Sequence, residues 1–153
     1  LATDAIVNAA NSGLRAGGGV CGAIFQAAGY DELQAVCASI GHCPTGSAVI
    51  TPSFHMKSKY IIHAVGPIWQ GGTSGDPDLL FSAYRSALQL AMDNGCASIA
   101  FPLISAGIYG YPVDQAWDVA INATAAFSAD LDIIFAVLDK RILTLGQQKL
   151  GAL

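Results

Sequence analysis

The sequence predicts an α/β fold of three layers, in which helices cover both faces of a largely parallel sheet. Short apolar runs typical of strands alternate with stretches in which apolar residues recur every three or four positions, as they do along one face of a helix. The predicted strands are apolar at nearly every position, which is typical of strands buried on both faces. With 153 residues and 53% hydrophobic content, the chain suits one domain with a sizeable core.

The predicted elements can be placed by residue number. Strands are expected at residues 5–8, 47–51, 60–65, 98–101 and 133–138. Helices are expected at 20–28, 33–40, 79–93, 113–127 and from Asp139, whose carboxylate suits a helix cap. Residues 66–78 are rich in Gly, Pro, Ser and Asp and are expected to form a loop. The first helix is expected to turn Val20, Ile24, Ala27 and Ala28 to one face.

Composition excludes several classes of function. A net charge of -4 with only seven Lys and Arg argues against binding to nucleic acid, which relies on clustered cations. No apolar run approaches the roughly 18 residues of a membrane helix. Four irregularly spaced cysteines and the lack of a secretory signal favour a reducing, cytoplasmic setting. Cys37, His42 and Cys43 lack the paired spacing of a metal site, so neither a metal nor a cofactor is expected.

A first glycine-rich loop precedes the first helix. Gly17, Gly19 and Gly22 match the pattern G-x-G-x-x-G, but about eight residues separate them from the strand, and the helix leads to a second helix instead of a strand. That order excludes a dinucleotide site of the Rossmann type. Glycines still allow backbone N–H groups to approach a phosphate, and the helix near Val20 directs its positive end there. The alternative is a tight turn that only permits close packing.

A second loop of the same kind spans residues 105–110 and also lies between a strand and a helix. Ligands of open α/β sheets bind at the carboxyl ends of the strands, where both loops are expected, so two phosphates can be held between them. Gly-Lys-Ser/Thr is absent from the chain, which disfavours ATP hydrolysis of the P-loop kind.

Several segments resemble the macro domain family, the ADP-ribose-binding, Appr-1″-p processing family. Residues 4–11, which read DAIVNAAN, and the glycine segment 17–22 resemble the family's first motif. Residues 104–110, which read ISAGIYG, resemble its second motif. Residues 44–51 and 60–67 are also similar to family segments, and the likeness covers nearly the whole chain. The resemblance implies a three-layer α-β-α fold with a mixed, largely parallel sheet.

The resemblance also implies a ligand site. In similar proteins the two loops clamp the diphosphate, Asn11 faces the distal ribose and Tyr109 packs beside that sugar. The alternatives are a turn or cap role for Asn11 and a surface aromatic role for Tyr109. The ligand-binding residues that the resemblance implies are Asn8, Gly17, Gly18, Gly19, Val20, Ser105, Ala106, Gly107, Ile108, Tyr109, Gly110 and Leu138.

The catalytic prediction rests on Asn11 and Cys21. The chain is most similar to the bacterial and mitochondrial branch that removes ADP-ribose from acidic side chains or cleaves O-acetyl-ADP-ribose, and that branch has an Asp where this chain has Cys21. A thiol is a poorer base than the carboxylate it replaces, although macro domains resembling viral ones hydrolyse with a small apolar residue there. Cys21 is therefore either a catalytic group or a small residue of a helix face. The competing functions are an ADP-ribosyl hydrolase and a non-catalytic ADP-ribose reader.

The adenine end departs from the family pattern. Similar proteins carry a Gly-Asp-Ile-Thr segment just upstream of Leu1, and Leu138 stands where an aromatic is often found. Leu138 can cover adenine but cannot stack on it as a ring does. Residues 1–153 are therefore predicted to be a single macro domain that lacks its first strand, or one with a looser nucleotide preference. The expected partners are ADP-ribose, ADP-ribosylated protein or O-acetyl-ADP-ribose, with no nucleic acid or membrane, and the chain is expected to be monomeric.

Overall fold

The computed structural model describes residues 3–15, 19–72, 75–107, 109–137 and 139–151. The strands are β1 (Ala5–Ala9), β2 (Ala48–Pro52), β3 (Tyr60–Ala64), β4 (Ser98–Phe101) and β5 (Asp132–Phe135). The helices are α1 (Gly19–Ala28), α2 (Tyr30–Ile40), α3 (Asp76–Asp93), α4 (Val113–Ala125) and α5 (Lys140–Gly151). These strands and helices follow one another along the chain in the predicted order. None of the described helices is long and apolar enough to cross a membrane.

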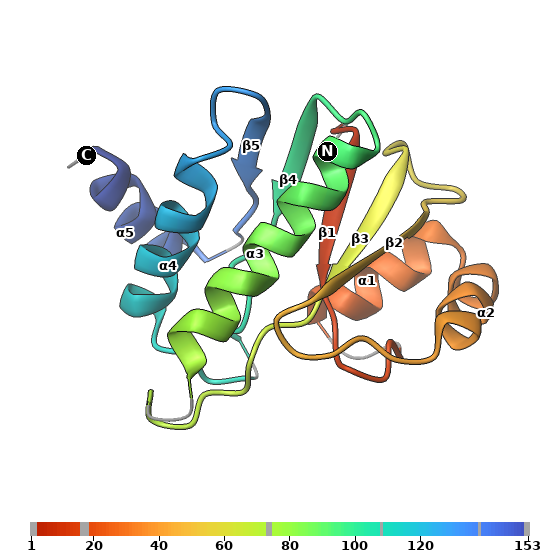
Figure 1. The fold of residues 1–153 in the computed structure, drawn as a ribbon, viewed down its shortest axis with the longest axis horizontal. Coiled ribbons are helices and arrows are strands. Elements are labelled where there is room, and N and C mark those ends of the chain that lie inside the picture. The colour runs from red at the N-terminus through yellow and green to blue at the C-terminus, as the bar shows by residue number, and fades with distance from the viewer. Residues whose placement is uncertain (1–2, 16–18, 73–74, 108, 138, 152–153) are drawn as a thin grey trace.

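The described strands form one sheet in the order β2-β3-β1-β4-β5 (Figure 1). β1 runs parallel to both β3 and β4, and β5 runs parallel to β4, whereas β2 is antiparallel to β3. The predicted mixed, largely parallel sheet is confirmed. Because β1, β3 and β4 point the same way, the loops that follow them lie at one edge of the sheet, which is called the carboxyl edge below.

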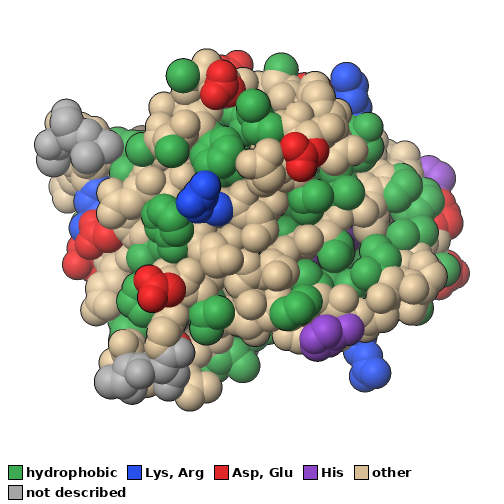
Figure 2. Space-filling model, viewed as in Figure 1, with side chains coloured by type: hydrophobic (Ala, Val, Ile, Leu, Met, Phe, Trp, Pro, Cys, Tyr) green, Lys and Arg blue, Asp and Glu red, His purple; other side chains and the backbone are tan. Residues whose placement is uncertain are grey.

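Helices cover the sheet on both faces. Ala5 and Val7 of β1 pack into a core with α3 and α4, whereas Ile61 and Val65 belong to a second core with α1 and α2. The alternation follows from the pleat, which sends successive side chains to opposite faces. The three layers predicted from the sequence are therefore present. Over the face seen in Figure 2, basic side chains are few and stand apart from one another.

Several local predictions were wrong in detail, including the start of α2, which is Tyr30, and the end of α4, which is Ala125. α3 begins at Asp76, inside the expected loop, because proline suits the first turn of a helix and acidic residues favour its positive end. β5 ends at Phe135, short of the expected end at 138. In α1, Ala27 faces solvent and Phe25 is buried, so the interior face lies about one residue away from the predicted one.

Candidate functional site

The loop after β1 closes on itself through Asn11. The side-chain nitrogen of Asn11 donates to the carbonyl of Arg15 at 2.9 Å, and its Oδ1 accepts from the N–H of Arg15 at 3.0 Å. The N–H of Leu14 also donates to the Asn11 carbonyl, and Leu14 has a positive φ of 55°. The turn role that the sequence left open for Asn11 is therefore present. An amide has two hydrogens and two acceptor lone pairs, so the same side chain has capacity for a sugar hydroxyl.

Cys21 lies where α1 meets the two loops. It is 9% exposed, belongs to the core under α1 and α2, and its Sγ lies 3.8 Å from the carbonyl oxygen of Arg15. Burial raises the pKa of Tyr109, and the nearby Cys21 raises it further. Cys21 therefore lies close to both loops while it packs as a helix-face residue, and its position fits both readings of the sequence.

The second loop is held by backbone hydrogen bonds. The N–H of Tyr111 donates to the Ser105 carbonyl at 2.9 Å, and the N–H of Gly110 donates to the Gly107 carbonyl at 3.0 Å. Ser105 is 6% exposed and has a φ of 67°, a conformation that costs a non-glycine residue free energy and that clusters at functional sites. Its Oγ is buried without a hydrogen-bond partner among the described residues.

The loop after β3 packs against this second loop. A Cβ on Gly66 would come within 2.5 Å of Ile104 Cγ2 and closer still to Ser105 Oγ, so only glycine fits there. The N–H of Trp69 donates to the Tyr109 carbonyl at 2.8 Å. These contacts fix Tyr109 from the side of β3. Residues 60–67 are similar to a family segment, but Gly66 is not among the site residues predicted from the sequence.

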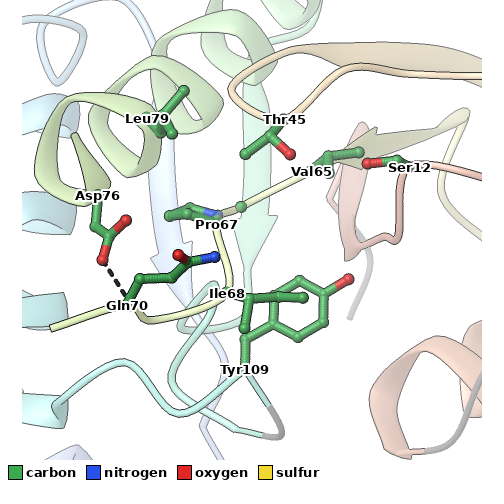
Figure 3. A pocket seen from close by; sticks show the side chains of 10 residues that line it. Ser12, Thr45, Val65, Pro67, Ile68, Gln70, Asp76, Leu79 and Tyr109 are labelled. Atoms are coloured by element: carbon green, nitrogen blue, oxygen red, sulfur yellow. Dashed lines mark hydrogen bonds between the residues drawn. The ribbon is translucent and has the colours of Figure 1, made fainter. Parts of the chain in front are cut away.

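A cavity of about 220 Å³ opens beside Tyr109 (Figure 3). It lies between the loops after β1 and β3 and the start of α3. The residues that line it are Ser12, Thr45, Val65, Gly66, Pro67, Ile68, Gln70, Asp76, Leu79 and Tyr109. Of these, only Tyr109 was predicted as a site residue.

Asn8 points into the core under α1 and α2. It is 1% exposed, and its Nδ2 lies 3.1 Å from Nδ1 of His63, while Nε2 of His63 lies 3.0 Å from Oγ1 of Thr51. Burial lowers the pKa of His63 to about 4, so the ring is neutral at pH 7. Because the Asn8 amide nitrogen can only donate, Nδ1 accepts and Nε2 carries the proton. The prediction of His63 as a satisfied core residue is confirmed, and Asn8 supports the end of β1.

The structure describes only some of the other predicted site residues. Gly19 and Val20 begin α1, and Ala106, Gly107 and Gly110 lie in the second loop. Gly17, Gly18, Ile108 and Leu138 lie outside the described residues, so the adenine end stays a prediction. Among the residues that are described, no group of three or more His, Cys, Asp or Glu is arranged to hold a metal ion.

Comparisons with known proteins agree on one family. The model of the family described as macro domain matches residues 7–120. A macro domain-containing protein of Chlorobaculum tepidum is 47% identical over 156 residues, with 99% of this chain and 90% of that protein covered. A protein of Citrobacter rodentium named O-acetyl-ADP-ribose deacetylase is 50% identical over 131 residues, with 83% of this chain and 73% of that protein covered.

Solved structures give the same result. The Oceanobacillus iheyensis macrodomain with ADP aligns with a TM-score of 0.93 at 38% identity and covers 99% of this chain and 85% of that chain. The Trypanosoma brucei macrodomain in complex with ADP-ribose aligns with a TM-score of 0.89 at 36% identity. That alignment covers 98% of this chain and 64% of the Trypanosoma brucei chain. The likeness extends over the whole described sheet and its helices.

Proposed function

This chain belongs to the macro domain family, and on that premise we propose that it binds ADP-ribose and hydrolyses the ester that links ADP-ribose to an acyl group. The observation that carries the proposal is that the start of α1, the loop after β1 and the second loop meet at the carboxyl edge of the sheet, where Cys21 lies beside Arg15 and Tyr109. Support also comes from the relative named O-acetyl-ADP-ribose deacetylase and from the solved macrodomains with ADP and ADP-ribose.

The diphosphate is proposed to lie between the two loops. α1 begins at Gly19, so its positive end and unpaired N–H groups face the first loop. In the second loop the carbonyls of Ser105 and Gly107 accept backbone hydrogen bonds, and a Cβ at Gly107 would meet nothing within 4 Å among the described residues. With seven Lys and Arg in the whole chain, backbone dipoles are proposed to meet most of the phosphate charge.

The distal ribose is proposed to lie between Asn11 and Tyr109. The Asn11 amide is already oriented by its two hydrogen bonds to Arg15, so little side-chain entropy is lost when it binds a sugar hydroxyl. Tyr109 is fixed through its carbonyl by Trp69. The Tyr109 ring beside the sugar is proposed to exclude water from all but the attacking position.

In the proposed reaction, water adds to the ester carbonyl, the bond to the ribose oxygen breaks, and ADP-ribose and a carboxylate are released. A positioned carboxylate base typically accelerates such a step by about 100- to 10,000-fold. This chain has Cys21 at that place, so the hydrolysis is proposed to be slow, with water held by the substrate's phosphate and the loops. Cys21 is also the observation that favours the second candidate, a reader that binds without turnover.

The experiment combines calorimetry with ADP-ribose and release of label from a mono-ADP-ribosylated protein, using wild type, Asn11→Ala and Cys21→Asp. Asn11→Ala is expected to weaken binding by about tenfold, the value of one or two hydrogen bonds. Cys21→Asp is expected to raise label release by about 100-fold or more. Asn122→Ala, an exposed change on α4, is the control and should leave both quantities unchanged.

The outcomes separate the candidates. Binding by wild type with no release by any variant would leave the reader. Release that Cys21→Asp does not increase would contradict the role given to that position. Absence of ADP-ribose binding by a folded wild type would overturn the proposal as a whole.

A further inference from the structure

We propose that the cavity beside Tyr109 is the subsite for the group attached to the distal ribose, and that Asp76 makes it prefer attached groups with positive charge. This proposal rests on the proposed function, because it needs the ribose to lie at Asn11 and Tyr109. It goes further by naming where the modified protein sits and which sequences around the modified residue are favoured.

The position of the cavity supports this assignment. One end of its wall is formed by Ser12, the neighbour of Asn11, and by Tyr109 (Figure 3). From there the lining passes Pro67 to Asp76 and Leu79 at the start of α3. A group bonded to a ribose between Asn11 and Tyr109 therefore has the cavity next to it.

The size of the cavity favours a protein-linked group over acetyl. A volume of about 220 Å³ corresponds to roughly seven water molecules at about 30 Å³ each. An acetyl group would fill a small part of that space and leave the rest to water. An acidic side chain in ester linkage, together with part of a neighbouring residue, has room there.

The lining has a single sign of charge. None of the described residues that line the cavity is Lys, Arg or His, and Asp76 is the only carboxylate among them. Ser12 and Thr45 add hydroxyls, and Val65, Ile68 and Leu79 add apolar walls. A half-apolar pocket with one carboxylate attracts a cation or a hydrogen-bond donor and repels a second carboxylate.

Two backbone N–H groups hold the Asp76 carboxylate in place. It is 2% exposed, and its Oδ2 accepts the N–H of Gln70 at 2.8 Å and the N–H of Gly72 at 3.3 Å. Neutral donors fix the carboxylate without cancelling its charge. Burial raises the pKa of the neighbouring Tyr111, and the negative charge of Asp76 raises it further.

The test uses ADP-ribose joined at C1″ of the distal ribose to short peptides through a hydrolysis-resistant oxime. Two peptides differ only in the residue next to the linkage, Lys in one and Glu in the other, and free ADP-ribose is the reference. Calorimetry is run on wild type, Asp76→Asn, Thr45→Trp and Thr144→Trp. Thr45 is an exposed residue at the rim of the cavity, and Thr144 is an exposed residue of α5 that serves as its matched control.

Wild type is expected to bind the Lys peptide about three- to tenfold more tightly than the Glu peptide, the value of one partly screened charge pair. Asp76→Asn, which keeps a side-chain acceptor for the loop, should reduce this ratio to about one. Thr45→Trp should lower the affinity for both peptide conjugates by about tenfold relative to the affinity for free ADP-ribose, because the indole occupies the cavity. Thr144→Trp should leave these affinities unchanged. In wild type the preference for Lys should shrink as salt rises.

Equal affinities for the two peptides in wild type would overturn the proposal, even if Asp76→Asn does not fold. A preference that survives Asp76→Asn, or one that salt does not change, would also overturn it. These failures are distinct from failure of the proposed function, which would appear as no binding of free ADP-ribose.

Discussion

The two faces of the sheet are built from different side chains. The core under α3 and α4 is rich in rings, and Trp117, Tyr84, Phe101 and Phe135 pack at centroid separations of 5.1 to 6.3 Å. The core under α1 and α2 contains Cys21, Cys37 and Cys43 and lies beside the buried His63 network. Aromatic side chains bury the largest apolar areas, whereas thiols and an imidazole bury less area and carry polar atoms.

The difference suggests that the aromatic core mainly stabilises the fold, whereas the core under α1 and α2 also shapes the ligand site. The aromatic face reaches the start of the second loop through Tyr84, whose hydroxyl accepts the N–H of Ile104, the residue before that loop, at 3.0 Å. The thiol-containing face places Cys21 at the first loop and Asn8 at the end of β1. We therefore expect changes in the part of the aromatic core remote from Tyr84, such as at Trp117, to lower the free energy of unfolding without altering the site. Changes in the other core, or at the junction of the loops, should affect ligand binding as well.

The largest expected effect is that of Trp117→Ala. Trp117 is 2% exposed, its indole N–H donates to the Ile142 carbonyl at 2.8 Å, and it fills the space left by Gly146 of α5. Removal of a buried tryptophan typically costs about 3–5 kcal/mol of unfolding free energy. Urea denaturation measures the loss. Calorimetry on the folded variant should give the wild-type affinity for ADP-ribose, and a tenfold weaker affinity would contradict the proposed division.

The second prediction concerns the pH dependence of stability through His63. Its pKa is lowered to about 4 in the folded protein and is near 6.5 in the unfolded chain. Between these values the unfolded state binds more protons, so stability rises with pH through this window and is lost as pH falls from about 6.5 towards 4. The loss should be roughly 2–3 kcal/mol, at 1.36 kcal/mol per pKa unit with allowance for relaxation.

The measurement is urea denaturation at several pH values for wild type, His63→Gln and His55→Gln. His63→Gln should remove most of the difference between pH 6.5 and pH 4 and leave only the share due to carboxylates. The pair between His55 and Glu32 is exposed and therefore contributes little to stability, so the His55 variant should keep nearly the wild-type slope. A slope in His63→Gln equal to that of wild type would contradict the buried, neutral state of this ring.

Gly66→Ala tests the junction between the two faces. The new methyl group would overlap Ile104 and Ser105, and overpacking of this kind typically costs about 1–3 kcal/mol. Because the displaced residues are the first residue of the second loop and the one before it, ADP-ribose affinity should fall by about tenfold as well. Gly151→Ala is the matched control, since a Cβ there meets nothing within 4 Å among the described residues. Unchanged affinity in Gly66→Ala would show that loop packing does not set the site.

The smallest expected effect is that of Asp139→Ala at the start of α5. Oδ1 of Asp139 accepts the N–H of Arg141 at 2.8 Å and the N–H of Ile142 at 3.3 Å. Loss of such a cap typically costs about 1 kcal/mol. Thermal denaturation should show a small decrease in the melting temperature, with Asp130→Ala, an exposed change in the turn before β5, as the comparison. A decrease no larger than in that comparison would argue against the cap.

Local features were predictable because local chemistry determines them. The Asp139 cap and the glycines after α1 and α2 were read directly from residue type, and Gly29 and Gly41 have positive φ values of 113° and 85°. The buried His63 was predictable from its place in an apolar strand. Asp76 was placed in a loop because Asp, Gly and Pro are typical both of loops and of the first turn of a helix.

The cavity could not have been predicted in the same way. Ser12, Thr45 and Asp76 are distant in sequence and meet only because β1 and β3 pair with each other and α3 packs against β3. The close approach of Gly66 to Ser105 is likewise a property of two neighbouring strand ends. Residue patterns along the chain predict elements, whereas these contacts depend on how the elements assemble.

The central claim is that two glycine-rich loops clamp the diphosphate of ADP-ribose. The most direct measurement is calorimetric titration of the wild-type protein with ADP-ribose, set beside titration with adenosine, which lacks the diphosphate and the distal ribose. We expect saturable binding of one ADP-ribose per chain and affinity for adenosine that is weaker by about 100-fold or more, the value of one or two charge-assisted hydrogen bonds. Equal affinities for the two compounds, or no binding of ADP-ribose, would contradict the claim.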